Sequence, residues 1–354
     1  MTEEMPLLSL CVPTYNRAAL LAQSLRAILS QITPDMARAV EVVVIDNASP
    51  DDTPAVVQKA QEDYPHIALR SVCRPENIGC DANFCDSPNQ ARGTFVYLLS
   101  DDDALLPGAV LKLLQLIRDH PELDAFALNV REFRREPDEQ EAEILYEGAL
   151  VRPHAFHMRE AEKLLPDADA ALSFLRVHIA FLSCIAFRGD NVRGRDYAPR
   201  LKTNLAQAYM FLDALAPGRG LYAVAQPFLS RRTDNNEGFD FFRVFVTNFH
   251  AMMRHARSLG YSEAAVEQAS RQHIDFVYNF VLVFKEQGGY GKLRVSYAGC
   301  LRAAWRLARA YSDRQRVWVQ IIPRLLVPAA VFSGLKRFYQ RGRRRPAGAS
   351  EVSK

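Results

Sequence analysis

The chain has 354 residues, of which 49% are hydrophobic and 24% are charged, and its formal net charge is +3. It is long and apolar enough to bury a substantial core, in two domains or in one large domain with a smaller one. The six cysteines form no CxxC pair and no regular framework, which excludes a disulfide-built scaffold, and the N-terminus lacks the pattern of a secretory signal. We therefore expect a reduced, cytoplasmic protein.

Apolar runs alternate with segments of helical periodicity through the first third of the chain. The predicted strands are residues 7–12, 41–45, 67–72 and 95–99, and the predicted helices are residues 18–31, a segment through Val56 and Ala60, 81–91 and 109–119. Pro13 is expected to break the first strand, and Pro88 to interrupt or end the third helix. Strands that alternate with helices at this spacing predict parallel βαβ units.

Three consecutive carboxylates, Asp101, Asp102 and Asp103, follow the apolar run at residues 95–99. This run has no polar alternation, so it is expected to be a strand buried on both faces. Carboxylates gathered where a strand leaves its sheet favour a divalent cation, Mg²⁺ or Mn²⁺, with phosphate oxygens beyond it. The alternative is a solvated acidic turn that caps the next helix.

The carboxyl ends of the four predicted strands all carry polar clusters. These clusters lie at residues 14–17, 46–47, 74–77 and 101–103. In parallel α/β sheets such ends meet at one edge, where ligands bind. Neither GxGxxG nor GxxxxGKS occurs, so a bound diphosphate would need its charge balanced by a carboxylate-held metal ion. These residues predict a metal-dependent nucleotide site on a Rossmann-like half.

The first 110 residues resemble family 2 glycosyltransferases of the GT-A fold. The resemblance rests on VPTYNR at 12–17, VVIDNASPDDT at 43–53, NIG at 77–79, ARG at 91–93 and LLSDDD at 98–103. With DANF at 81–84, the pattern is most similar to abequosyltransferase-type members of bacterial O-antigen synthesis. The implied fold is α/β, a mostly parallel Rossmann-like sheet flanked by helices, followed by a helical C-terminal region.

The resemblance also implies roles for single residues. Asp46 would accept a hydrogen bond from a base ring N–H, and Asn47 would support its loop. The other residues implied to contact the nucleotide are Pro13, Thr14 and Tyr15 at the base, with Arg17 nearby, and Arg74, Asn77 and Gly79. The acidic run stands where the family carries its DxD motif, although the usual pattern would place a carboxylate at Ser100. Either Asp101 and Asp103 form the metal pair, or Asp102 takes the metal position.

The implied reaction is an inverting displacement at an anomeric carbon, in which a carboxylate takes the acceptor proton. Many relatives carry a Glu-Asp pair on a helix after an apolar segment like residues 181–188, but residues 203–213 here contain no such pair. Asp213 is the nearest carboxylate and our candidate base. Asp190, Asp196 and His178 are other candidates, and for each of them a surface charge or a satisfied polar residue is the simpler interpretation.

A last strand is predicted at residues 221–229. In many relatives of the similar family an Arg-containing segment at this place helps to hold the diphosphate, so the resemblance implies this role for Arg231 or Arg232, through paired N–H donors. The alternative is a plain basic loop. We therefore assign residues 1–236 to the glycosyltransferase domain. Residues 237–316 have apolar helical faces and are predicted to be an all-helical region, with glycines at 288, 289 and 291 between its helices.

The tail, residues 317–354, joins an apolar segment to a strongly basic run at 336–345. Two prolines and Arg324 argue against a membrane span, whereas Trp318 beside a cationic cluster favours contact with an anionic bilayer surface. The alternative is a docked helix with a disordered tail. No nucleic-acid partner is expected, because the basic run belongs to no recognisable binding module.

The leading hypothesis is an inverting enzyme that moves a sugar from a nucleotide diphosphate sugar to a lipid-linked saccharide, acting peripherally at the inner face of the cell membrane. A sugar nucleotidyltransferase would normally show a glycine-rich and basic loop after the first strand, and residues 13–17 are not such a loop. A non-catalytic sugar-nucleotide-binding or scaffold protein stays open, because the Glu-Asp pair is missing.

Overall fold

The computed structural model describes residues 5–133, 152–153, 162–232, 239–287, 296–328 and 331. The chain divides into two compact units. The first comprises Met1–Asn235 and Ala251–Gln272, and the second comprises Asn236–His250 and His273–Lys354. Two of the three divisions fall inside the helices α7 (Phe249–Ser258) and α8 (Glu263–Gln287). The domain boundaries that we expected after residues 236 and 316 stay predictions.

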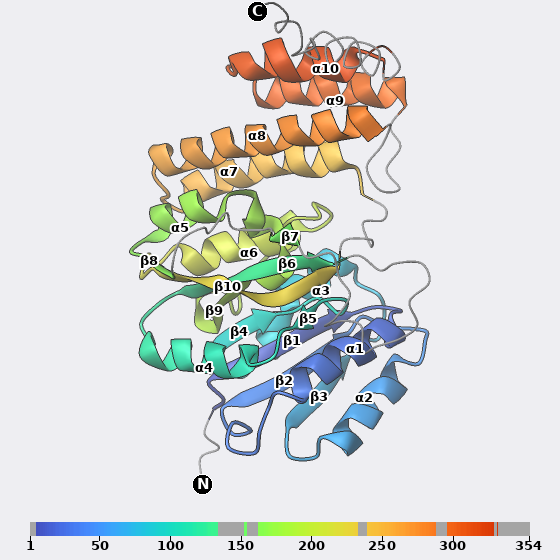
Figure 1. Cartoon of the computed structure of the whole chain (residues 1–354), viewed down its shortest axis with the longest axis vertical. Helices are drawn as coiled ribbons and strands as arrows, with labels where there is room; N and C mark the ends of the chain where they lie inside the picture. The colour runs from blue at the N-terminus through green and yellow to red at the C-terminus, as the bar shows by residue number, and fades with distance from the viewer. Residues whose placement is uncertain are drawn as a thin grey trace, which may run out of the picture. The chain divides into compact units, whose positions relative to one another are not determined.

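The first unit is built on a mixed sheet with the strand order β3-β2-β1-β4-β9-β6-β10-β5, while β7 pairs with β6 and β8 pairs with β10 (Figure 1). The strands are β1 (Leu8–Thr14), β2 (Val40–Asp46), β3 (Ala68–Cys73), β4 (Phe95–Leu98), β5 (Ala104–Leu105), β6 (Ala125–Phe133), β7 (Arg152–Pro153), β8 (Lys163–Leu165), β9 (Ile185–Arg188) and β10 (Leu221–Arg232). Strands β1 to β4 are mutually parallel, as predicted. Beyond β4 the sheet is mixed, because β9 inserts antiparallel between β4 and β6.

Helices flank this sheet, which confirms the predicted α/β class (Figure 1). Helix α1 packs against α2, and α3 packs on β1 and β2 and against α6. Pro88 lies inside α3, two residues before the helix ends. The helices of this unit are α1 (Ala18–Leu29), α2 (Thr53–Asp63), α3 (Cys80–Gln90), α4 (Ala109–Asp119), α5 (Ala168–Leu175) and α6 (Ala206–Leu215).

Strands β1 and β2 are buried along their whole length, which explains why their sequences show no polar alternation. Strand β1 does not break at Pro13 but continues to Thr14. Its pairing with β4 ends at Cys11, whereas its pairing with β2 continues through Pro13. The missing N–H of Pro13 therefore falls where β1 has a neighbouring strand on one side only, a position at which a sheet tolerates proline.

Gly93 fixes the start of β4 through a close approach to β1. Its N–H donates to Ser9 Oγ at 2.7 Å, and a Cβ on residue 93 would lie only 2.7 Å from the backbone nitrogen of Ser9. The same hydroxyl donates to the buried carboxylate of Glu41 at 2.5 Å. The glycine of the ARG segment at 91–93 is therefore required by the fold, because no larger residue fits there.

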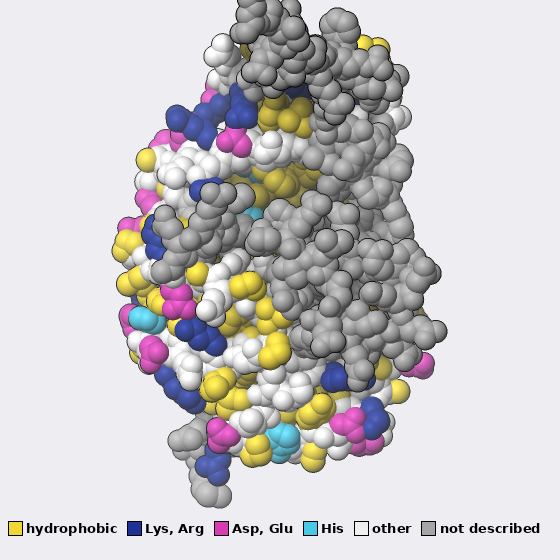
Figure 2. Space-filling model, viewed as in Figure 1, with side chains coloured by type: hydrophobic (Ala, Val, Ile, Leu, Met, Phe, Trp, Pro, Cys, Tyr) yellow, Lys and Arg dark blue, Asp and Glu magenta, His cyan; other side chains and the backbone are white. Residues whose placement is uncertain are grey.

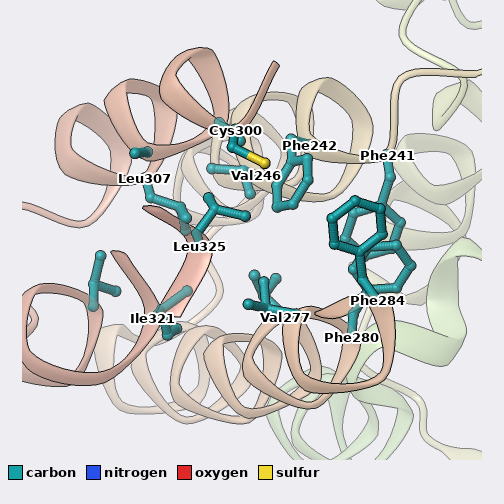
Figure 3. Packing of buried hydrophobic residues seen from close by; sticks show 14 of the residues in the cluster. Phe241, Phe242, Val246, Val277, Phe280, Phe284, Cys300, Leu307, Ile321 and Leu325 are labelled. Carbon is teal, nitrogen blue, oxygen red and sulfur yellow. The ribbon is translucent and has the colours of Figure 1, made fainter. Parts of the chain in front are cut away.

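The second unit is helical, as predicted. It contains the π-helical turn η6 (Arg243–Asn248), parts of α7 and α8, α9 (Tyr297–Ala310), the π-helical turn η7 (Val317–Ile321) and α10 (Ile322–Leu326). Figure 3 shows how Phe241, Phe280 and Phe284 gather at one end of its core, and the rings of Phe241 and Phe280 stack with centroids 3.4 Å apart. Cys300 and Leu307 of α9 join the same core.

The basic run of the predicted tail, residues 336–345, lies outside the described residues. The glycines at 288, 289 and 291 also lie outside them. Within the described ranges, no helix combines the length and the hydropathy that crossing a bilayer requires. On the face drawn in Figure 2, side chains of both charge signs are interspersed with hydrophobic ones over the described surface. This mixture agrees with the small net charge of the whole sequence.

Candidate functional site

The ends of β1, β2 and β3 lie in register at one edge of the sheet. Thr14 pairs with Asp46, and Asp46 pairs with Cys73, each as the last residue of its strand. Strand β4 is parallel to β1 and ends three residues before Asp101. The polar clusters predicted to converge therefore do converge at the carboxyl edge of the parallel strands.

Asp101 is held by two residues from the end of β1. The Thr14 hydroxyl donates to Asp101 Oδ2 at 2.7 Å, and Arg17 Nη1 donates to Asp101 Oδ1 at 3.0 Å. Burial raises the pKa of Asp101 to about 6, although the Arg17 charge and the Thr14 hydrogen bond both act to lower it and Asp102 acts to raise it. The carboxylate is thus kept out of water and oriented by its neighbours.

The three carboxylates of the acidic run have different surroundings. Asp102 accepts from the Ser100 hydroxyl at 2.6 Å and lies 3.5 Å from Arg17 Nη1. Its side chain is 13% exposed, whereas that of Asp101 is 4% exposed. Asp103 is buried and accepts from Ser183 Oγ at 2.7 Å, so it is engaged in the interior. Of the three, Asp102 is the most accessible to a ligand.

The donor set of Asp101 and Asp102 fits a hard divalent cation. Their oxygens converge on one cationic atom, Arg17 Nη1, at 3.0 and 3.5 Å. Among the described residues no three His, Cys, Asp or Glu side chains form a complete ligand group. Mg²⁺ is commonly held by one or two carboxylates together with substrate phosphates, so two carboxylates beside a diphosphate suffice.

Asp46 organises the loop that follows β2. Its Oδ1 accepts the backbone N–H of Ser49 at 2.9 Å, and the thiol of Cys73 lies 3.6 Å from Oδ2. The backbone carbonyl of Asp46 accepts the N–H of Arg74 at 2.8 Å. Ala48 adopts φ +62°, a left-handed conformation that turns the chain sharply beside the strand end.

Asn47 joins this loop to the NIG segment. Its Nδ2 donates to Asn77 Oδ1 at 2.8 Å, and its Oδ1 accepts the N–H of Ile78 at 3.0 Å. Asn77 Oδ1 also accepts the N–H of Gly79 at 2.8 Å. Gly79 directly precedes α3 and has φ +85°. Glycine adopts such a positive φ without strain. Asn47 thus connects the loop after β2 to residues 77–78.

The other residues predicted to contact the nucleotide, Pro13, Tyr15 and Arg74, differ in their exposure and in their contacts. Pro13 is buried in β1, while Tyr15 is exposed at the edge. The Arg74 guanidinium forms an ion pair with Asp86 of α3. Arg74 therefore lies at the predicted edge, but its charge is already directed to a carboxylate of the protein.

Arg231 lies at the end of β10, next to the acidic run. Ser230, its neighbour, pairs antiparallel with Ala104, which directly follows Asp103. The Arg231 guanidinium lies over the ring of Phe181, 4.8 Å from its centroid. The structure thus places the end of β10, which carries Arg231, beside the three carboxylates. The Arg232 side chain lies outside the described residues.

Asp213 contacts residues from other parts of the chain. It lies in α6, where every residue is buried, and its Oδ1 is 3.3 Å from His255 Nε2 and 3.5 Å from Arg195 Nη1. The other candidates have structural surroundings of their own: Asp190 pairs with Arg193 at 2.7 Å, and Asp196 accepts the N–H of Ala198 at 2.8 Å. His178 lies in the 3₁₀ turn η2 (Arg176–Ala180).

Two residues that organise this region gave no clear sequence signal. Ser183, from the turn η3 (Leu182–Cys184), accepts the N–H of Ser100 at 2.9 Å while its hydroxyl donates to Asp103. Asp81, in the first turn of α3, accepts the N–H of Asn204 at 3.0 Å. Burial raises the pKa of Asp81, against backbone N–H groups of residues 202–206 that act to lower it. The DANF segment contains this aspartate, but nothing in the sequence gives its partner.

Comparisons with known proteins identify a family model and curated relatives that this chain resembles. Residues 9–180 match the model of Glycosyl transferase family 2. The GalNAc(5)-diNAcBac-PP-undecaprenol beta-1,3-glucosyltransferase of Campylobacter jejuni is 40% identical over 111 residues, 31% of this chain and 34% of that protein. Abequosyltransferase RfbV of Salmonella typhimurium is 34% identical over 115 residues, 32% of this chain and 33% of the relative. The match spans about a third of the length of these curated relatives.

Solved structures share the architecture over nearly the whole chain. The crystal structure of S. aureus TarS 1-349 in complex with UDP-GlcNAc has a TM-score of 0.62 and 14% identity, covering 95% of this chain and 92% of that one. The complex of TarS 1-349 with UDP gives 0.61 and 16%, covering 98% and 94%. At these identities the likeness shows the fold alone, and it confirms the GT-A fold predicted from the sequence.

Proposed function

The chain carries a family 2 glycosyltransferase domain in residues 9–180, and from this premise we propose that it is an inverting glycosyltransferase. The donor is a nucleotide diphosphate sugar and the acceptor is a lipid-linked saccharide. One observation carries the proposal: Thr14, Asp46 and Asp101, which end or follow three different strands, meet at one edge of the sheet. That edge is where open α/β sheets bind nucleotides.

The nucleotide is assigned to the loops after β1, β2 and β3. In this assignment Asp46 accepts a hydrogen bond from a ring N–H of the base, and Tyr15 provides an exposed aromatic surface against it. The Asn47 bridge to Asn77 and Ile78 keeps this pocket in shape before the donor arrives. The other residues assigned to the nucleotide are Pro13, Thr14, Arg17, Arg74 and Gly79.

A divalent cation, Mg²⁺ or Mn²⁺, belongs to the proposal, with Asp102 and Asp101 as its ligands. When bound, it would neutralise charge on the diphosphate leaving group. Thr14 holds Asp101 in orientation, and Arg17 pairs with both carboxylates. Asp103 supports the run from the interior through Ser183. Arg231 is assigned to the diphosphate, where a guanidinium can donate two parallel N–H groups.

The reaction also needs a group that takes the proton of the acceptor hydroxyl. Asp213 remains the candidate from the sequence, but its pairing with His255 and Arg195 favours a structural ion pair. The same observation favours a second candidate function, that of a sugar-nucleotide-binding protein without transfer activity. Donor turnover in the presence of lipid extract separates the two.

The wider role is proposed from the similar proteins. One relative carries undecaprenol in its name and another is an abequosyltransferase. We assign this chain to the synthesis of a bacterial O-antigen, capsule or exopolysaccharide, at the cytoplasmic face of the membrane. The tail, residues 317–354, is proposed to contact that membrane through its apolar segment and its basic run.

The test is a thermal-shift screen of the protein against nucleotide diphosphate sugars, each with Mn²⁺ and with EDTA. A donor at 100 times its Kd should stabilise the protein by about 2.7 kcal/mol, and EDTA should remove most of the shift. Asp102→Asn should lose the Mn²⁺-dependent part. Asp63→Asn, which alters an exposed ion pair with Lys59, is the matched control and should behave as wild type. No shift with any donor would refute the proposed site.

A further inference from the structure

Helix α9 of the second unit presents an apolar stripe to solvent. Tyr297, Leu301 and Trp305 are 57%, 47% and 61% exposed. They are spaced four residues apart, so their side chains lie along one face of the helix. Exposed large apolar residues are ordinary when they are scattered, but an aligned aromatic and aliphatic stripe marks a contact surface.

The opposite face of α9 is already used for folding. Cys300, Ala303, Ala304 and Leu307 are buried in the core of the second unit, and Figure 3 shows Cys300 and Leu307 pointing into it. The helix is therefore apolar on both sides, and the core accounts for only one of them. The outward stripe needs a separate explanation.

The charged side chains of α9 itself are all positive. Helix α9 contains three arginines and no acidic residue. Arg302 is exposed beside the stripe, and the Arg309 guanidinium lies over the ring of Trp305, 5.3 Å from its centroid. Arg306 lies toward the core side and pairs with Asp240 at 2.6 Å. Arg302 and Arg309 thus border the stripe along one side, and their charges favour an anionic partner.

We propose that the face of α9 formed by Tyr297, Leu301, Arg302, Trp305 and Arg309 docks on an anionic phospholipid surface. Tyrosine and tryptophan favour the boundary between acyl chains and headgroups, and arginine can bury its stem while its charge stays among the phosphates. A helix with this distribution lies in the plane of the interface. The length of α9, 14 residues, does not suffice to cross the bilayer.

The chemistry of the face favours lipid over sugar. A saccharide partner needs directional hydrogen-bond partners around an aromatic platform, and the stripe is bordered by alanine and arginine without Asn, Gln, Asp or Glu in α9. This contact goes beyond the proposed sugar transfer and is separate from the tail. It requires neither donor nor acceptor, so its failure would leave the proposed function untouched.

The two tryptophans of the sequence make the contact directly measurable. They are Trp305 and Trp318, and both are exposed. Trp318→Phe leaves Trp305 as the single tryptophan of the full-length protein, and excitation at about 295 nm reports on it without the tyrosines. Vesicles of phosphatidylglycerol with phosphatidylcholine should shift the Trp305 emission to the blue, and brominated acyl chains should quench it. Phosphatidylcholine vesicles should do so less, and high salt should weaken the effect.

The decisive variant is Leu301→Glu, measured by co-sedimentation with the same vesicles. We expect its partition coefficient to fall about tenfold or more, because a charged carboxylate replaces an apolar side chain at the interface. Leu111→Glu is the matched control, since Leu111 is a 44% exposed leucine of a helix in the first unit. It should sediment like wild type.

Three results would overturn the proposal. The first is an unchanged Trp305 emission in anionic vesicles. The second is sedimentation of Leu301→Glu equal to that of wild type, which would move the contact elsewhere, for example to the basic tail. The third is a vesicle-free oligomer that Leu301→Glu converts to monomer, which would make this face an interface between copies of the chain.

Discussion

The hydroxyl of Thr14 donates a 2.7 Å hydrogen bond to the carboxylate of Asp101, which lies 87 residues further along the chain. Thr14 is the last residue of β1, and Asp101 follows the neighbouring parallel strand β4. Thr14 lies three residues after Cys11, just as Asp101 lies three residues after Leu98, the partner of Cys11. The contact fixes one carboxylate of the acidic run relative to the nucleotide loops. It therefore links the two halves of the proposed site.

Thr14→Val should weaken Mn²⁺-dependent donor binding about tenfold while leaving the fold intact. Valine keeps the β-branched shape that suits the strand, so only the hydroxyl is lost. A hydrogen bond to a charged group contributes about 1.5–3 kcal/mol, and without it Asp101 loses one of its two orienting partners. Isothermal titration of a nucleotide sugar with and without Mn²⁺ measures the effect.

Thr14→Ser is the matched control, because serine keeps the donor. It should bind the donor within about threefold of wild type. If Thr14→Val binds the donor as tightly as Thr14→Ser in Mn²⁺, the hydrogen bond has no part in the site.

Asp46→Asn should reduce affinity for the donor nucleotide by about 10- to 100-fold. The amide oxygen of asparagine can still accept the N–H of Ser49, so the loop after β2 should keep its turn. The amide nitrogen would then face the base, and two donors would meet where a carboxylate accepted. Binding is measured in the presence of Mn²⁺, and circular dichroism checks the fold. Wild-type affinity in a folded variant would remove Asp46 from the base pocket.

The first half of the sheet could be predicted because its signals are local. Strands β1 and β2 are continuous apolar runs, and the parallel connection through helices forces their carboxyl ends to one edge. That constraint alone brought Thr14, Asp46 and Asp101 together. No property of the individual residues beyond their position after a strand was needed.

The rest of the sheet depends on contacts that local sequence does not encode. Strand β9 has four residues and inserts antiparallel between β4 and β6, so neither its length nor its neighbours give its place. The contact of Ser183 with Asp103 follows from that insertion and spans 80 residues. The acidic run alone left its metal register open. Only the three-dimensional structure shows that Asp102 is more exposed than Asp101 and that Asp103 is buried and accepts a hydrogen bond from Ser183.

Asp213→Asn separates a structural carboxylate from a proton acceptor. Asp213 is buried between His255 and Arg195, so we expect the free energy of unfolding to fall by about 1–3 kcal/mol. We expect kcat per folded molecule to change less than tenfold, whereas loss of a general base typically costs at least a hundredfold. Urea unfolding and single-turnover kinetics measure the two quantities. A folded, stable variant with a hundredfold lower kcat would make Asp213 the base.

The second unit should lose stability as the pH falls, through His273. This imidazole is fully buried, stacks on Phe249 with ring centroids 3.5 Å apart, and forms a hydrogen bond with the carbonyl of Phe245. Burial lowers the pKa of His273 to about 4, despite the hydrogen bond to Phe245, which acts to raise it. In the unfolded chain a histidine has a pKa of about 6.5.

Between these two values the unfolded state binds a proton that the folded state excludes. The free energy of unfolding should therefore fall as the pH drops from about 6.5 to about 4, by about 1.4 kcal/mol per pH unit at most. His273→Phe keeps an aromatic ring for Phe249 to stack on and removes the titration, so its stability should change less between pH 7 and pH 5 than that of wild type. Urea unfolding at both pH values measures the difference, followed by far-UV circular dichroism. Equal losses in the two proteins would show that other groups govern the acid sensitivity of this unit.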